Sequence, residues 1–104
     1  MLQASVGNVI HMVALDEVLT LEAADKYVQV LTTQHEYLIR TPLREILPRL
    51  DPQVFWQVHR GHVVRARAID TVTRDDAGKV WLQLRGRPGR IAVSRLYAQR
   101  FKAM

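Results

Sequence analysis

Short apolar runs, several with a period of two, dominate the chain. In residues 27–32 (YVQVLT) alternate side chains fall on opposite faces, as in a β-strand. Gln34 and His35 are expected to form a two-residue hairpin turn. The strands expected from such runs cover residues 9–13, 18–24, 27–32, 36–40, 68–74, 80–84 and 91–93. Seven or eight short strands at close spacing predict a mainly β fold.

Residues 55–64 (FWQVHRGHVV) contain the most distinctive local pattern. Two apolar flanks enclose a basic turn made of His59, Arg60, Gly61 and His62. This arrangement predicts buried flanks that hold Arg60 exposed, with Gly61 permitting a turn that a bulkier residue would resist. The planar guanidinium of Arg60 suits a phosphate or the O6/N7 edge of guanine. We expect His59 to support the turn through a hydrogen bond.

Two short helices are also expected. Thr41 is a capping residue and Pro42 suits a first helical position, and Pro48 should end this helix after about two turns. Ser94 is expected to cap a second helix that continues to residue 101. Arg95 would then lie at a helix N-terminus, where a cation is unfavourable unless an anion such as phosphate is bound.

The charge of the chain is distributed unevenly. Residues 1–59 hold four Lys/Arg and seven Asp/Glu, a net charge of −3, whereas residues 60–104 hold eleven Lys/Arg and three Asp, a net charge of +8. Nine of those eleven basic residues are arginines, which favours bidentate contacts with phosphates or bases. Nucleic acid is therefore the first partner class expected. An acidic protein or membrane surface is the alternative.

Two further partner and domain assignments follow from composition. An RNA-binding β module would need exposed aromatic side chains, whereas the aromatic residues here are expected mainly in the core. With 104 residues, 48% of them hydrophobic, and no linker or repeat, the chain is expected to form one domain, residues 1–104.

Several kinds of chemistry find no support in the sequence. The chain has no cysteine, so disulfides, thiol catalysis and zinc ribbons are excluded. His59 and His62 do not supply the three or four ligands that zinc needs, so no metal or other cofactor is expected. No phosphate-binding glycine loop or nucleophile elbow is present, and we expect no enzyme. No apolar run approaches the ~20 residues of a membrane span, and we expect a cytoplasmic protein.

Four sequence blocks, in this order, resemble the LytTR family of DNA-binding domains. They are residues 22–28 (EAADKYV), residues 41–50 with spaced leucines, Phe55-x-x-x-His59-Arg60 followed by Val63-Val64 and Ile69, and Val93-Ser94-Arg95-x-Tyr97. The blocks span nearly the whole chain, residues 8–101. No single block identifies the family, but four blocks in the same order do.

The resemblance implies a fold, a function and partners. The fold would be an elongated stack of short antiparallel β-sheets with one or two short helices. The function would be sequence-specific duplex DNA binding, as the output domain of a bacterial transcription regulator of the two-component response-regulator type. Loops would enter successive major grooves at paired direct repeats, with a homodimer on the DNA. A receiver or other sensory domain would lie elsewhere in a longer protein.

By position, the resemblance also implies DNA-facing residues. Arg60 and Arg95 would read base edges with help from Lys26 and its neighbours, and His59 would lie in the same turn as Arg60. Phosphate neutralisation is expected from a further set: Ser94, Arg65, Arg67 and the arginines of residues 85–90.

Two positions depart from the family pattern. Gly61-His62 replaces the usual Ser-Tyr, which removes a hydroxyl that could reach a phosphate. Arg65 stands where the family usually has Asn, which leaves the function of that position open.

Overall fold

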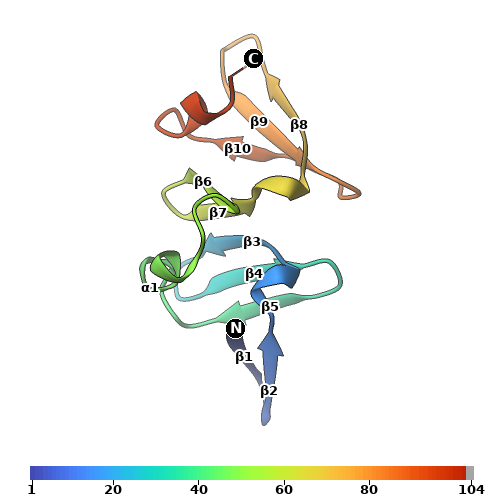
Figure 1. Cartoon of the computed structure of the whole chain (residues 1–104), viewed down its shortest axis with the longest axis vertical. Coiled ribbons are helices and arrows are strands. Elements are labelled where there is room, and N and C mark those ends of the chain that lie inside the picture. Colours follow the sequence, from blue (N-terminus) through green and yellow to red (C-terminus); the bar gives the residue numbers. More distant parts are fainter. Residues whose placement is uncertain (103–104) are drawn as a thin grey trace.

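The chain folds into three antiparallel β-sheets that are stacked along its longest axis (Figure 1). The computed structural model describes residues 1–102 and has principal extents of 48 × 27 × 24 Å. A two-stranded sheet lies at one end, a five-stranded sheet in the middle and a three-stranded sheet at the other end. The mainly β, antiparallel, elongated architecture expected from the sequence is confirmed.

The sheets join strands in the orders β1-β2, β5-β4-β3-β7-β6 and β10-β9-β8. The strands are Leu2–Val6 (β1), Val9–Val13 (β2), Val18–Ala23 (β3), Val28–Thr32 (β4), Glu36–Ile39 (β5), Phe55–His59 (β6), His62–Arg65 (β7), Ile69–Arg74 (β8), Val80–Leu84 (β9) and Ile91–Val93 (β10). The helical segments are one α-helix, Leu43–Ile46 (α1), and the 3₁₀ turns Leu15–Glu17 (η1), Leu47–Arg49 (η2), Ala66–Ala68 (η3) and Ala98–Arg100 (η4). Within residues 1–102 no helix is both long and apolar enough to cross a membrane.

The central sheet has a hydrophobic core on each of its faces. Successive side chains of a strand point to opposite faces, so the adjacent residues Val63 and Val64 of β7 enter different cores. Val63 joins a cluster with β1, β3, β4 and α1, in which Leu21 and Ile46 are fully buried. Val64 joins a second cluster with β9 and β10, around the fully buried Leu82.

Direct hydrogen bonding connects the central and C-terminal sheets. The amide of Ser94, which follows β10, donates to the carbonyl of Val58 in β6 over 2.8 Å. The edge strands β10 and β6 of the two sheets therefore lie next to each other, and the segment after β10 is held beside the end of β6.

The strand count exceeds the expected seven or eight, because β1 and the two flanks of the basic turn are all strands. Leu2 and Ala4 of β1 are buried, whereas Ser5 and Val6 are exposed. This five-residue strand (LQASV) shows too short an alternation to be recognised without its partner β2.

The expected two-residue turn at Gln34 and His35 is wrong in length, since residues 33–35 separate β4 from β5. The hydroxyl of Thr32 explains the longer loop. It accepts from the amides of Gln34 (3.3 Å) and His35 (3.0 Å) and donates to the carbonyl of His35 (3.1 Å). Such side-chain bonds stabilise a local turn of their own.

The first helix has the expected length but a different start. It comprises α1 and then η2, which contains Pro48, and it ends at Arg49. Pro42 occupies the N-cap in extended conformation, and no side chain, Thr41 included, caps the helix through a hydrogen bond.

The second expected helix is wrong. Only the 3₁₀ turn Ala98–Arg100 forms, its N-cap is Tyr97, and Ser94 does not cap it. Arg95 lies in a turn before this segment, so the helix-dipole argument for an anion at Arg95 does not hold.

Candidate nucleic-acid interface

Three loops lie on one long side of the molecule, at the left in Figure 1: the loop after β3, the turn between β6 and β7, and the segment after β10. Backbone hydrogen bonds connect their bases. The amide of Ala23 donates to the carbonyl of Gly61 over 2.7 Å, and Ser94 bonds to Val58 as described. Lys26, Arg60 and Arg95 belong to these three loops and are all exposed. The fold thus brings together the three basic residues that the sequence resemblance singled out.

The turn that carries Arg60 is held by three hydrogen bonds. The side chain of Gln57 donates through Nε2 to the carbonyl of Arg60 over 3.1 Å, and the amide of Gly61 donates to Nδ1 of His59 over 3.1 Å. The third is the bond from Ala23 to Gly61. His59 therefore supports the turn as expected, in a tautomer whose Nδ1 accepts. The result is a fixed backbone beneath an exposed guanidinium.

Gly61 is favoured by the limited space at this turn rather than by a left-handed backbone. It is not among the glycines with positive φ. A Cβ at this position would lie 3.3 Å from the Cβ of Ala23, closer than an ordinary van der Waals contact. The close approach of the β6–β7 turn to β3 thus explains the glycine at a position where the family usually has serine.

His62 is the half-buried histidine beside this turn. Burial lowers the pKa of His62 below its ordinary value, and the neighbouring His59 lowers it further. Glu22 opposes this effect on the pKa, since its carboxylate lies 3.7 Å from Nδ1 of His62. His62 and Glu22 are cross-strand partners of β7 and β3, and a depression between β3, the turn and β10 is lined by both, together with Arg60 and Arg90.

Lys26 lies in an exposed loop with further basic neighbours. The depression that it lines is also lined by Arg40, before α1, and Arg44, within α1. The guanidinium of Arg40 lies 6.0 Å from the ring centre of Tyr27. Arg40 and Arg44 were missed from the sequence, because nothing in their spacing shows that the β5–α1 connection lies beside the β3–β4 loop.

Arg95 also has basic neighbours from a different hairpin. It lines a depression with Ser94 and with Arg74 and Lys79, which border the β8–β9 turn. These two residues were likewise not selected from the sequence. Only the antiparallel pairing of β9 with both β8 and β10 brings this turn beside the end of β10.

Arg65 has partners inside the fold. Its Nε donates to the carbonyl of Val18 over 2.8 Å, and its terminal nitrogen donates to the carbonyl of Leu15 over 2.5 Å. The guanidinium lies 4.6 Å from the ring centre of Phe55. This half-buried side chain connects β7 to η1 and β3, which gives a structural reason for Arg at a position where the family usually has Asn.

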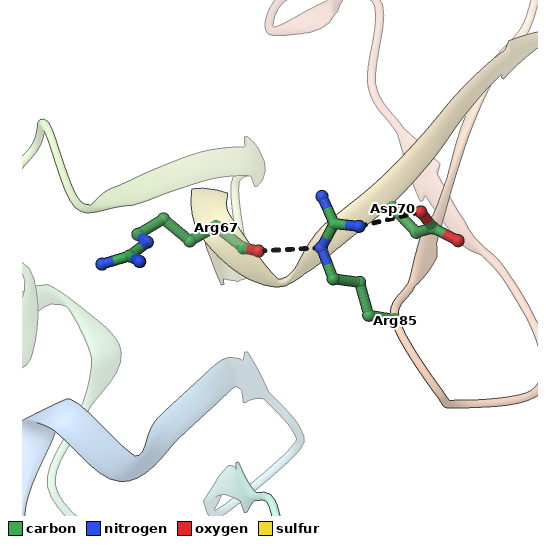
Figure 2. A network of polar contacts seen from close by, with 3 residues as sticks. All are labelled: Arg67, Asp70 and Arg85. Atoms are coloured by element: carbon green, nitrogen blue, oxygen red, sulfur yellow. Dashed lines mark hydrogen bonds and ion pairs between the residues drawn. The ribbon is translucent and has the colours of Figure 1, made fainter.

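The arginines of residues 85–90 also have intramolecular contacts. Arg85 donates to the carbonyl of Arg67 over 3.3 Å and forms an ion pair of 3.0 Å with Asp70, as Figure 2 shows. Arg87 donates to the carbonyl of Thr32 over 3.4 Å, and the guanidinium of Arg90 lies 3.9 Å from the ring centre of Trp81. The loop between β9 and β10 lies at the right in Figure 1, opposite the three basic loops. The contacts of Arg85 and Arg87 favour a structural role over phosphate binding, whereas Arg90, at the end of this loop, also lines the depression beside Arg60.

The aromatic residues are less buried than expected. Phe55 is buried and Tyr27 is exposed, whereas Trp56, Trp81, Tyr97 and Phe101 are partly buried. No group of three or more potential metal ligands occurs among residues 1–102.

Three exposed basic loops along one side of an elongated β stack define a nucleic-acid-binding domain that presents loops rather than a recognition helix. Residues 8–104 match the LytTr DNA-binding domain family. The chain belongs to this family, and it is a DNA-binding domain.

Two similar proteins support this assignment. An uncharacterised response regulatory protein of Vibrio cholerae is 47% identical over 87 residues, which cover 80% of this chain and 33% of that protein. The chain thus spans about a third of the curated relative that it matches. The LytTr DNA-binding domain of a protein described as a methyl-accepting/DNA response regulator from Bacillus cereus has the same fold, with a TM-score of 0.83 at 23% identity, over 95% of this chain and 90% of that one.

Proposed function

We propose that this chain is the output domain of a bacterial response regulator and binds duplex DNA at paired direct repeats, as a homodimer on the DNA. The relative from Vibrio cholerae, described as a response regulatory protein and much longer than the matched region, supports a receiver or other sensory domain in the same protein. Residues 1–104 would form a single DNA-binding domain, acting in the cytoplasm where bacterial DNA is found.

The observation that carries the proposal is the row of exposed basic loops. Arg60 and Arg95 would insert into major grooves and read base edges, with Lys26 assisting and with His59 and Ser94 beside them. The three loops follow strands of the central and C-terminal sheets on the same side of the molecule, so they would face the duplex together.

One residue that the resemblance placed among the phosphate contacts, Arg65, is assigned differently. Arg65 is occupied by backbone carbonyls, so we assign it to the fold rather than to DNA. A basic module for an acidic protein, a membrane surface or RNA receives less support, because the family is one of DNA-binding domains.

Selection from a random duplex library at near-physiological salt tests this function, because non-specific binding is then weak. The wild type should recover a repeated motif. Arg60→Ala and Arg95→Ala should each lose information at different positions of that motif, since a bidentate base contact contributes about 1–3 kcal/mol of discrimination. Arg85→Gln, which alters a residue bound to Asp70, is the matched control and should recover the wild-type motif.

Uniform weak retention of all sequences by the wild type would refute sequence-specific regulation. Recovery of the full motif by Arg60→Ala would remove that residue from base reading.

A further inference from the structure

A second group of basic residues borders the C-terminal side of the proposed DNA surface. The turn between β8 and β9 and the segment after β10 enclose a shallow depression whose charged lining residues are Arg74, Lys79 and Arg95. Among residues 1–102, no carboxylate lines it. Ser94 also lines it, half-buried directly after β10.

The side chains of Arg74 and Lys79 have defined positions. Arg74 donates to the carbonyl of Gly78 over 3.3 Å, and Nζ of Lys79 lies 5.0 Å from the ring centre of Trp81. Both residues are exposed, and neither takes part in an ion pair among residues 1–102. Among the described residues, the ion pairs are those of His62 with Glu22 and of Arg85 with Asp70.

The nearest carboxylate, Asp75, is directed into its own turn. It accepts from the amides of Ala77 (3.0 Å) and Lys79 (2.8 Å) and from Nε1 of Trp81 (3.1 Å). These bonds occupy both carboxylate oxygens and shape the turn that presents Lys79. These bonds do not neutralise Asp75, and Asp76 in the same turn is exposed, so both carboxylates oppose the positive charge of Arg74 and Lys79.

We propose that Arg74 and Lys79, with the Ser94 hydroxyl, bind a backbone phosphate of the DNA that flanks the base contacted by Arg95. This proposal rests on the proposed function of the same surface. A phosphate suits the site, because exposed cations and a hydroxyl donor around a depression without acidic lining favour an anion. Contacts of this type fix the orientation of a protein on the duplex but carry no sequence information.

The salt dependence of binding tests the proposal. Affinity for the selected duplex and for a scrambled duplex would be measured by fluorescence anisotropy from low to moderate salt, for the wild type, Arg74→Gln, Lys79→Gln and the double variant. The double variant loses this phosphate contact and should show a slope of log K against log salt that is smaller in magnitude by about 0.9 on both duplexes, with a smaller reduction in each single variant. The affinity ratio between the two duplexes should stay within about twofold of the wild-type ratio.

Two further variants sharpen the result. Arg85→Gln removes one positive charge that is already paired with Asp70 and should keep the wild-type slope. Asp76→Asn removes one of the two opposing charges and should strengthen binding to both duplexes. Tryptophan emission of each free variant shows whether the surroundings of Trp81, and thus the fold of this hairpin, are preserved.

Unchanged slopes in Arg74→Gln and Lys79→Gln, or an equal fall in Arg85→Gln, would overturn the phosphate site. The wild type could bind both duplexes equally while the salt-dependence slopes of the two variants are still smaller than its own. That result would refute sequence-specific regulation but support the phosphate site. A wild type that binds neither duplex would refute both.

Discussion

The position of Arg60 is fixed before any DNA is bound. Gln57, His59 and Ala23 each bond to the backbone of its turn, and Gly61 lets this turn approach β3 closely. A binding loop that is already ordered loses less conformational entropy on association. The sequence predicts what the Arg60 guanidinium can bind. Residues of β6 and β3 hold the turn that presents it.

His62 should make the stability of the domain depend on pH. Burial lowers its pKa in the folded state, whereas the unfolded chain titrates near 6.5. Below about pH 6.5 the unfolded chain therefore binds a proton that the folded chain resists, and the free energy of unfolding falls as pH decreases. Urea denaturation between pH 8 and 5 should show this fall in the wild type and a smaller one in His62→Gln.

Glu22→Gln tests the carboxylate that opposes the lowering of the pKa of His62. Removing the carboxylate should lower the pKa of His62 further and steepen the loss of stability in acid. A shift of one pKa unit corresponds to about 1.4 kcal/mol, so the size of the loss measures the shift. The same pH dependence in wild type and His62→Gln would exclude His62 as its source.

At the scale of elements, the side chain of Arg65 connects β7 to neighbouring elements of the fold. It bonds to carbonyls of η1 and β3 and covers Phe55, so one side chain connects three elements. From the sequence it is another arginine in a basic stretch, and only its partners distinguish it from Arg60. Exposed and structural arginines cannot be separated by residue type.

Arg65→Met should therefore reduce stability by about 1–3 kcal/mol, because two carbonyls lose a charged donor. Arg65→Lys, which keeps the charge but offers no planar fork, should give an intermediate loss. Urea denaturation provides the measurement, with DNA affinity determined on the folded fraction. Wild-type stability combined with weakened DNA binding in Arg65→Lys would instead place this side chain on the DNA.

Element boundaries show where local rules are sufficient. The alternation in β3, β4, β8 and β9 predicted strands that exist, and Pro48 marks the change from α1 to a 3₁₀ turn. The cap assigned to Ser94 failed because the amide of that residue bonds to Val58 in another sheet and its carbonyl accepts from Tyr97 in a tight turn. Tertiary hydrogen bonds overrode the local propensity for a helix.

At the scale of the whole molecule, the central sheet couples the two cores. Phe55 and Val63 belong to one cluster, and Val58 and Val64 of the same hairpin belong to the other. Neither core can be disrupted without exposing a face of β6 and β7. The three sheets should thus unfold in one cooperative transition despite the elongated shape.

Single-tryptophan variants test this coupling. Trp56 reports on the central sheet and Trp81 on the C-terminal sheet, so Trp81→Phe and Trp56→Phe each leave one local probe. Within each variant, the denaturation midpoints from fluorescence and from circular dichroism should coincide. Ile46→Ala, which removes a fully buried side chain from the first core, should lower the Trp81 midpoint in the Trp56→Phe background, with a loss of about 2–5 kcal/mol in stability. A Trp81 transition insensitive to Ile46→Ala would show that the two cores unfold independently.

The sequence by itself determined the mainly β class, most strands, the basic C-terminal half and the family, because alternation, charge and motif order are local or additive properties. The tertiary structure decided which basic residues share a surface. Arg74 and Lys79 reach Arg95, and Arg40 and Arg44 reach Lys26, only through the packing and pairing of segments that are distant in sequence. The tertiary structure also decided which arginines bond inside the fold, because a guanidinium can donate to a backbone carbonyl as well as to a phosphate, and residue type does not show which acceptor lies nearby.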